Sequence, residues 1–210
     1  LLKTSVSEGV HQVIILGAGF DTRAVRLDFL KSVSVIEIDH PNTSNFKAEI
    51  YKKRIGKIPM NVTFLQIDFN KQSLDQLAAE NNLDFSKPTA IIWEGVTNYL
   101  TEEAVKNTFT FISKFATKSR VIFTYVHKNI LHHPESFLGG TKLLEDLEKL
   151  EERWTFGFLP EEVSNYLNQF GIRLLEDFGA DEYREKFLPK RAEKGYEFYR
   201  TAVGVKCGLT

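Results

Sequence analysis

The chain has 210 residues, of which 42% are hydrophobic and 6 are proline. This length and composition are typical of one globular domain with its own core, so we expect residues 1–210 to form a single domain. Lysine and arginine number 27 against 28 acidic residues, and this net charge of −1 argues against a nucleic-acid partner.

The chain contains one cysteine, Cys207, so we expect no disulfide framework and no cysteine metal site within it, which suits a reducing cytoplasm. Because no run of about 18 apolar residues occurs, we expect no membrane span. Residues 1–12 are too short and polar for a signal peptide, and we expect them to be the end of a helix whose beginning is absent.

Strands and helices alternate along the first part of the chain. Apolar and β-branched runs predict strands at residues 13–16, 33–39, 62–68, 89–95 and 120–126. Helical spacing and capping residues predict helices at residues 22–30, 43–55, 73–81 and 101–115. This alternation predicts a parallel sheet with helices on both faces.

The end of the chain departs from this alternation. Leu159-Pro160 opens a helix that ends at Gly171, and residues 172–177 and 198–206 have the composition of strands. The charged connection between these strands contains no convincing helix. An antiparallel hairpin is therefore expected rather than another crossover.

An insertion at residues 128–158 precedes this ending. It contains an amphipathic helix whose apolar residues recur at helical spacing: Leu143, Leu144, Leu147, Leu150 and Trp154. The apolar face of this helix either packs on the core or forms a lid over a substrate pocket. Both interpretations fit the sequence.

The turn Gly17-Ala18-Gly19 follows the first strand. Glycine is costly in conformational entropy and is kept where another group must approach the backbone closely. In an open parallel sheet, ligands bind beyond the carboxyl ends of the strands, which is where this turn lies. Further strands end in acids on the same edge: Asp39, Asp68 and Glu94.

Two classes of cofactor use this geometry. A dinucleotide fingerprint requires a small residue where this chain has Thr22, and Asp21 would place negative charge beside the phosphates. Both residues disfavour a nicotinamide-dependent oxidoreductase, which is kept as an alternative together with a catalytically silent cofactor-binding protein. S-adenosylmethionine carries no phosphate and has a sulfonium and an ammonium group. It needs glycines for close backbone approach, which makes Gly17 and Gly19 candidate contacts, and Asp39 stands where a ribose-binding carboxylate belongs.

Several of these side chains also have structural interpretations. Asp21 and Arg23 are expected to form a local cap and ion pair. Glu37 is expected to pair with Arg23 or Arg26, because it lies deeper in its strand than Asp39. Asp39 itself has no obvious structural role at a strand end, which favours a role in binding.

Four stretches, QVIILGAGFDTRAVRL, VIEIDHP with Lys47 following, LQIDF and WEGVTNYL, resemble the leucine carboxyl methyltransferase family. The match is especially to its bacterial branch of S-adenosylmethionine-dependent methyltransferases and covers most of residues 12–125. It implies a class I methyltransferase fold, an α/β architecture with a Rossmann-like, mostly parallel sheet and an antiparallel C-terminal hairpin. It also implies cofactor contacts at Gly17, Asp39, Asp68, Phe69 and Glu94, with Asp68 and Phe69 flanking the adenine.

Members of this family also carry an N-terminal helical segment whose basic residue is thought to hold the cofactor carboxylate. In this sequence, Lys3 is the only lysine or arginine before the first strand. In members of this family, substrate choice resides in the region that corresponds to the residues beyond Tyr125. The resemblance of this sequence to the family is weaker there.

The expected function is S-adenosylmethionine-dependent methylation of an oxygen on a small-molecule acceptor. Methyl transfer from a sulfonium is an in-line displacement to which the protein contributes mainly positioning. A carboxylate acceptor is ionised at neutral pH, whereas a hydroxyl acceptor benefits from a general base. Tyr99 and His127 are the candidate catalytic residues, although packing is the more expected role of Tyr99. The histidines of this loop lack accompanying carboxylate spacing, so no metal is expected.

Overall fold

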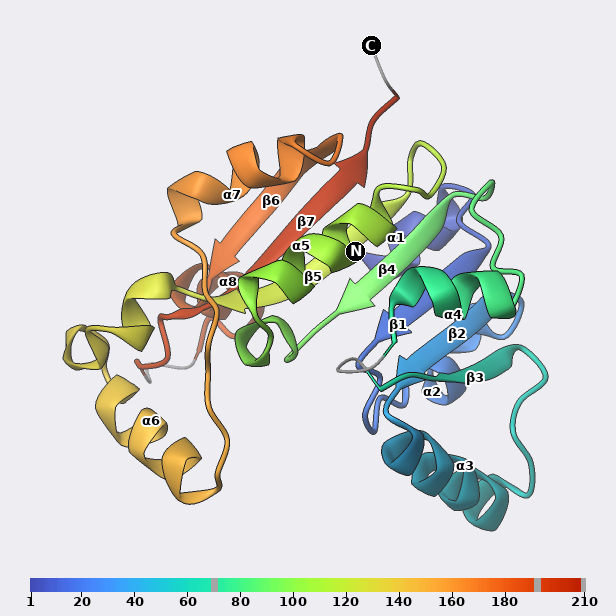
Figure 1. Ribbon diagram of the computed structural model, residues 1–210, viewed down its shortest axis with the longest axis horizontal. Helices are drawn as coiled ribbons and strands as arrows, with labels where there is room; N and C mark the ends of the chain where they lie inside the picture. Colours follow the sequence, from blue (N-terminus) through green and yellow to red (C-terminus); the bar gives the residue numbers. More distant parts are fainter. Residues whose placement is uncertain (69–71, 191–193, 209–210) are drawn as a thin grey trace.

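The computed structural model describes residues 1–68, 72–190 and 194–208. Within these residues, strands form one seven-stranded sheet in the order β3-β2-β1-β4-β5-β7-β6 (Figure 1). The strands are β1 Gln12–Leu16, β2 Ser34–Asp39, β3 Val62–Gln66, β4 Thr89–Trp93, β5 Arg120–Val126, β6 Ile172–Gly179 and β7 Tyr199–Lys206. The first five pair in parallel, as the alternation of strands and helices predicts.

β1 is an interior strand of the sheet, and its residues are buried throughout. It pairs with β2 on one side and β4 on the other, and Leu16 lies opposite both Ile38 and Trp93. A strand buried on both faces reads as a continuous apolar run, which explains its sequence. This register brings the ends of the three strands to the same edge of the sheet.

Helices cover both faces of the sheet (Figure 1). One face carries α4 (Leu74–Glu80), α5 (Glu102–Ile112) and α7 (Pro160–Asn168), which share a large apolar cluster with the strands. The other face carries α1 (Leu2–Ser7) and α2 (Arg23–Arg26), which pack on a second cluster. Among the described residues, no helix combines the length and apolar character needed to cross a bilayer.

Local capping chemistry sets where several helices begin. Thr101 is the N-cap of α5, because its Oγ1 accepts a hydrogen bond from the Ala104 amide at 3.2 Å. The helix predicted at residues 43–55 is α3 (Pro41–Ile55), which begins two residues earlier. His40 caps this helix through Nδ1, and Pro41 fits the first helical position because it needs no amide donor there.

The helix predicted at residues 22–30 is interrupted. It comprises the short α2 and a 3₁₀ turn at Asp28–Leu30, because Leu27 between them has extended backbone angles of φ −102° and ψ 106°. β2 begins soon after this turn, so the connection from β1 to β2 contains little helix.

The antiparallel C-terminal ending is confirmed. β7 runs antiparallel to both β5 and β6 and lies between them. The connection from β6 to β7 does contain a helix, α8 (Ala180–Phe187), where the sequence indicated no convincing one. Acidic residues in its first turn favour it, and Glu182 Oε2 accepts a hydrogen bond from the Gly179 amide at 2.5 Å.

The amphipathic helix of the insertion is α6 (Gly140–Lys149), which ends before Leu150 and Trp154, although the sequence spacing placed both in the helix. Its leucines pack on a small apolar cluster formed by Val126, Ile130, Trp154 and Phe198 rather than on either large cluster. In Figure 1 the helix lies below the end of β5, away from the covered faces of the sheet.

Candidate functional site

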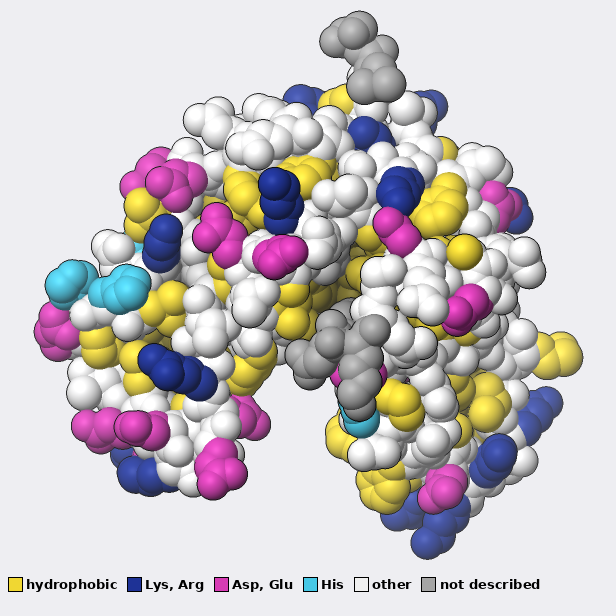
Figure 2. All heavy atoms as spheres, viewed as in Figure 1, with side chains coloured by type: hydrophobic (Ala, Val, Ile, Leu, Met, Phe, Trp, Pro, Cys, Tyr) yellow, Lys and Arg dark blue, Asp and Glu magenta, His cyan; other side chains and the backbone are white. Residues whose placement is uncertain are grey.

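The carboxyl edge of the parallel strands opens onto a broad hollow in the surface. Figure 2 shows this hollow between the segment that carries α6 and the part of the molecule that carries α3. The arrowheads of β2 and β4 in Figure 1 point toward it. The residues singled out in the sequence therefore lie along one edge, as expected for a ligand site of an open α/β sheet.

The two glycines of the turn serve different purposes. Both have positive φ, +65° at Gly17 and +43° at Gly19, which favours glycine over any residue with a Cβ. A Cβ on Gly17 would overlap Cγ2 of Val96, so the group that approaches Gly17 closely belongs to this chain. A Cβ on Gly19 would meet no described atom nearer than the Gly17 carbonyl oxygen, at 3.9 Å. Close approach by a ligand is thus open at Gly19.

Asp39 holds the glycine turn in place. Its Oδ2 accepts a hydrogen bond from the Gly19 amide at 2.5 Å, and its Oδ1 accepts one from the His40 amide at 2.6 Å. The expectation that Asp39 lacks a structural role is therefore wrong, because its carboxylate joins the turn to the end of β2. A carboxylate offers about four acceptor positions, so two hydrogen bonds leave capacity for hydroxyl donors.

Arg23 links the turn to the end of β4. Its guanidinium pairs with Asp21 at 2.8 Å and with Glu94, and the Asp21 carboxylate also accepts the Arg23 amide at 2.7 Å. The predicted ion pair of Asp21 and Arg23 is confirmed, whereas the N-cap position of α2 is Thr22, whose side chain makes no capping hydrogen bond. Burial lowers the pKa of Arg23 while hydrogen bonds to Glu94 and Asp21 raise it, and the net change is upward. The guanidinium stays charged beside two carboxylates.

These residues line a cavity of about 390 Å³. Its wall comprises the glycine turn and the segment after it, with Asp21, Arg23, Arg26 and Glu94 as the charged groups. This volume falls within the usual range for small-molecule sites. The cavity presents both signs of charge, a set of groups that can hold an ammonium and a carboxylate of one ligand.

Asp68 lies two residues beyond β3, next to the end of β2. Its amide donates to Gln72 Oε1 at 3.4 Å, and its carbonyl oxygen accepts from the Gln72 amide at 2.9 Å. The structure thus places Asp68 on the same edge as Asp39. Phe69, the other predicted adenine neighbour, lies outside the described residues.

Tyr99 and His127 lie farther along the same edge, after β4 and β5. Tyr99 is 41% exposed, so packing is not its main role, and its hydroxyl donates to Glu152 Oε2 at 2.9 Å. Burial, together with Glu152, raises the pKa of Tyr99. His127 Nδ1 accepts a hydrogen bond from the Asn129 amide at 3.2 Å, and burial holds the pKa of this imidazole below its ordinary value.

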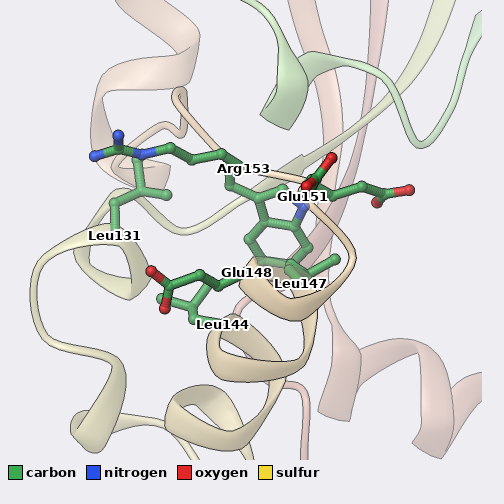
Figure 3. A pocket seen from close by; sticks show the side chains of 8 residues that line it. Leu131, Leu144, Leu147, Glu148, Glu151 and Arg153 are labelled. Carbon is green, nitrogen blue, oxygen red and sulfur yellow. The ribbon is translucent and has the colours of Figure 1, made fainter.

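A second cavity, of about 510 Å³, lies at α6. Figure 3 shows Leu144, Leu147 and Glu148 of the helix on one side and Leu131 and Arg153 on the other. Trp154 and Glu152 also line it, and Glu152 is the residue that Tyr99 contacts. This hydrogen bond connects the rim of the cavity to the segment that follows β4.

One pair near the site was predicted wrongly. Glu37 pairs with Lys47 at 2.5 Å rather than with Arg23 or Arg26. Arg23 turns instead to Asp21 and Glu94, while Lys47 reaches Glu37 from α3. The sequence spacing held a signal for this contact, since Lys47 lies on the buried face of α3 together with Ser44 and Tyr51.

The fold and this edge of the sheet define a class I methyltransferase architecture. The structure of a Thermobifida fusca protein provisionally named a methyltransferase superposes with a TM-score of 0.69 at 19% identity, covering 96% of this chain and 75% of that one. Magnesium protoporphyrin IX methyltransferase from Synechocystis, solved with bound SAH, superposes with a TM-score of 0.61 at 13% identity over 98% of this chain and 80% of that one.

The leucine carboxyl methyltransferase family model matches residues 1–113, and the chain belongs to this family. A Frankia alni protein provisionally named an S-adenosyl-L-methionine-dependent methyltransferase is 33% identical over 93% of this chain and 67% of its own length. A Streptomyces coelicolor protein with the same provisional name is 31% identical over 67% of this chain and 48% of its own length. The chain thus spans about half the length of several curated relatives it matches.

Proposed function

We propose that this protein is an S-adenosylmethionine-dependent methyltransferase that methylates an oxygen of a small-molecule carboxylate. The observation that carries the proposal is the Asp39 carboxylate, held against the Gly19 amide at the carboxyl edge with acceptor capacity to spare. Membership of the family and the names of the relatives support the same activity.

The first cavity, together with Asp39 and Asp68, which lie outside its lining, fits this cofactor. Asp39 and Gly19 would hold the ribose, since a carboxylate accepts from paired hydroxyls and the backbone at Gly19 is open to close approach. Glu94 and Asp21 would face the ammonium, and Arg23 or Arg26 the carboxylate, of the methionyl part. Asp68 would bond the adenine edge, while Phe69 is proposed for the same subsite from the family resemblance alone. When bound, the cofactor supplies a methyl group already activated on a sulfonium sulfur.

The state of the two candidate catalytic residues favours an acceptor that needs no general base. The Nδ1 lone pair of His127 is used by the Asn129 amide, which leaves Nε2 as the protonated nitrogen of the neutral ring. Tyr99 donates to Glu152, and its raised pKa keeps the phenol protonated. His127 Nε2 therefore acts as a hydrogen-bond donor that can orient an acceptor, whereas the single Tyr99 proton is already donated to Glu152, and neither group deprotonates an acceptor. A carboxylate is ionised at neutral pH and accepts such bonds.

The cavity at α6 is proposed as the place where the body of the acceptor binds. It is lined by four apolar side chains of the insertion (Leu131, Leu144, Leu147 and Trp154) and by four charged ones (Glu148, Glu151, Glu152 and Arg153). The Tyr99 to Glu152 bond connects it to the edge of the sheet. In this proposal residues 128–158 act as a lid, and closure of α6 would exclude water from the displacement. The whole of residues 1–210 is proposed to act as one domain.

Calorimetry with S-adenosylhomocysteine, S-adenosylmethionine and NADH tests the cofactor. We expect both sulfur ligands to bind and NADH not to bind. Tight binding of NADH with neither sulfur ligand would instead favour the oxidoreductase alternative and overturn the proposal.

Transfer of labelled methyl into a metabolite extract tests the reaction. A carboxylate acceptor yields a methyl ester, which mild alkali hydrolyses to volatile labelled methanol, whereas methyl ethers and N-methyl products retain the label. Alkali-stable product would contradict the carboxylate assignment. Ligand binding without turnover would indicate the catalytically silent alternative.

A further inference from the structure

The segment from β2 into α3 encloses a buried ion pair directly beneath Asp39. Lys47 and Glu37 have side chains that are 3% and 1% exposed, and Lys47 Nζ lies 2.5 Å from Glu37 Oε2. Glu37 lies two residues before Asp39 in the same strand, so both side chains point to the same face of β2. The pair thus lies one layer below the carboxylate that holds the glycine turn.

Burial of this pair is not explained by packing. A buried ion pair is often no more stabilising than apolar residues of the same volume, because both charges lose their hydration. The rest of the pocket offers Lys47 only weak compensation, with its Nζ 5.8 Å from the centre of the Tyr51 ring and 6.0 Å from that of Phe64. The charge of Lys47 therefore calls for a role that an apolar side chain could not fill.

The surroundings of Glu37 are acidic. The titratable groups that face it are Lys47 and Tyr51 of α3, Asp21 after β1 and Asp39 at the end of β2. Burial raises the pKa of Glu37, Lys47 opposes this rise, and Asp21 and Asp39 add to it. Its partners in the neighbouring strands, Ile15 of β1 and Phe64 of β3, are uncharged. Among these groups Lys47 supplies the positive charge.

The same segment fixes the position of Asp39. Asp39 Oδ1 accepts the His40 amide, His40 caps α3, and Lys47 returns from the second turn of α3 to Glu37. The strand end, the cap and the start of the helix form a closed unit. A bare carboxylate at position 37 would repel Asp39 or draw water into this unit, and either event would displace Asp39 from Gly19.

We propose that Lys47 is a positioning residue of the cofactor site, which neutralises Glu37 so that the Asp39 carboxylate stays aligned with the Gly19 amide. This inference rests on the proposed function, because its readout is binding of an adenosyl ligand. It assigns to the buried face of α3 a task in ligand binding as well as in packing.

The test measures S-adenosylhomocysteine affinity by calorimetry between pH 5.5 and pH 8.5 in Lys47→Met, with Lys53→Met as the matched control on the exposed side of α3. At neutral pH we expect Lys47→Met to bind about tenfold more weakly than the wild type and the control to bind as the wild type does. The loss should shrink at low pH, where the unpaired Glu37 takes up a proton, and should grow as the pH rises. A loss that is constant with pH would indicate lost packing alone and would overturn the proposal, as would unchanged affinity in the folded variant.

Adding Glu37→Gln to Lys47→Met removes the charge that Lys47 neutralises. We expect this double variant to recover affinity to within about threefold of the wild type, because neutral side chains leave Asp39 undisturbed. The double variant also carries the test if Lys47→Met alone does not fold. A folded double variant that binds more than about tenfold more weakly than the wild type would contradict the role assigned to Lys47. Failure of the wild type itself to bind would refute the proposed function instead.

Discussion

The close approach of Val96 to Gly17 leads to a quantitative prediction about the stability of the glycine turn. In Gly17→Ala the new methyl group overlaps Val96 Cγ2 while the backbone keeps a φ of +65°. The left-handed backbone costs an alanine about 1–2 kcal/mol, and overpacking costs about 1–3 kcal/mol more. We therefore expect the free energy of unfolding to fall by about 2–5 kcal/mol.

Gly19→Ala is the matched comparison. Its φ of +43° carries the same backbone penalty, but the nearest described atom to the new methyl group is 3.9 Å away. We expect a loss of about 1–2 kcal/mol, so the difference between the two variants measures the contact with Val96. Urea denaturation followed by circular dichroism gives both values, provided that the dependence of the free energy on urea is the same for each protein.

A double-mutant cycle with Val96→Ala isolates this contact. Removing Cγ2 should relieve the overlap in Gly17→Ala but leave the backbone penalty, which predicts a coupling free energy of about 1–3 kcal/mol. Equal losses in Gly17→Ala and Gly19→Ala, or a coupling below about 0.5 kcal/mol, would refute the argument that Val96 determines the glycine at position 17.

Three further predictions concern the charged groups of the site. Asp39→Ala removes the acceptor of two backbone amides, so we expect the free energy of unfolding to fall by about 2–4 kcal/mol and S-adenosylhomocysteine to bind at least about tenfold more weakly by calorimetry. A folded variant with wild-type affinity would exclude Asp39 from the site. Arg23→Met breaks the partly exposed pairs with Asp21 and Glu94, and urea denaturation should show a loss of about 1 kcal/mol that shrinks as salt is added. His127 has a folded pKa below its ordinary value, so below about pH 6.5 the unfolded chain binds a proton that the folded protein does not, and stability falls with falling pH. This slope should be smaller in His127→Gln, and an identical pH dependence of unfolding in the two proteins would count against the assigned burial.

The local sequence was sufficient to predict the parallel part of the sheet. The run Val13 to Leu16 suits a strand covered on both faces, and β1 is buried along its whole length between β2 and β4. The position of the site could also be predicted, because the carboxyl ends of parallel strands share one edge. Gly17, Asp39, Asp68 and Glu94 all lie there.

Helix boundaries and the connection to the last strand were less well predicted. His40 caps α3 through a ring nitrogen, a role that its residue type does not advertise, and α8 depends on a cap formed with the β6 end. The first residues of α3 and α8 each follow closely on a strand, so where these helices begin depends on the direction in which β2 and β6 leave the sheet.

The sequence by itself determined the succession of strands and helices along the chain, the glycine turn between β1 and α2 and the acids at the carboxyl edge, because each depends on residues close together in the chain. Only the tertiary structure decided which charges meet. Arg23 pairs with Glu94 across 71 residues of sequence, Glu37 with Lys47 across a strand and a helix, and Val96 rather than a ligand approaches Gly17. Charged side chains are long and the Coulomb interaction has no preferred direction, so their partners follow from how the strands and helices pack.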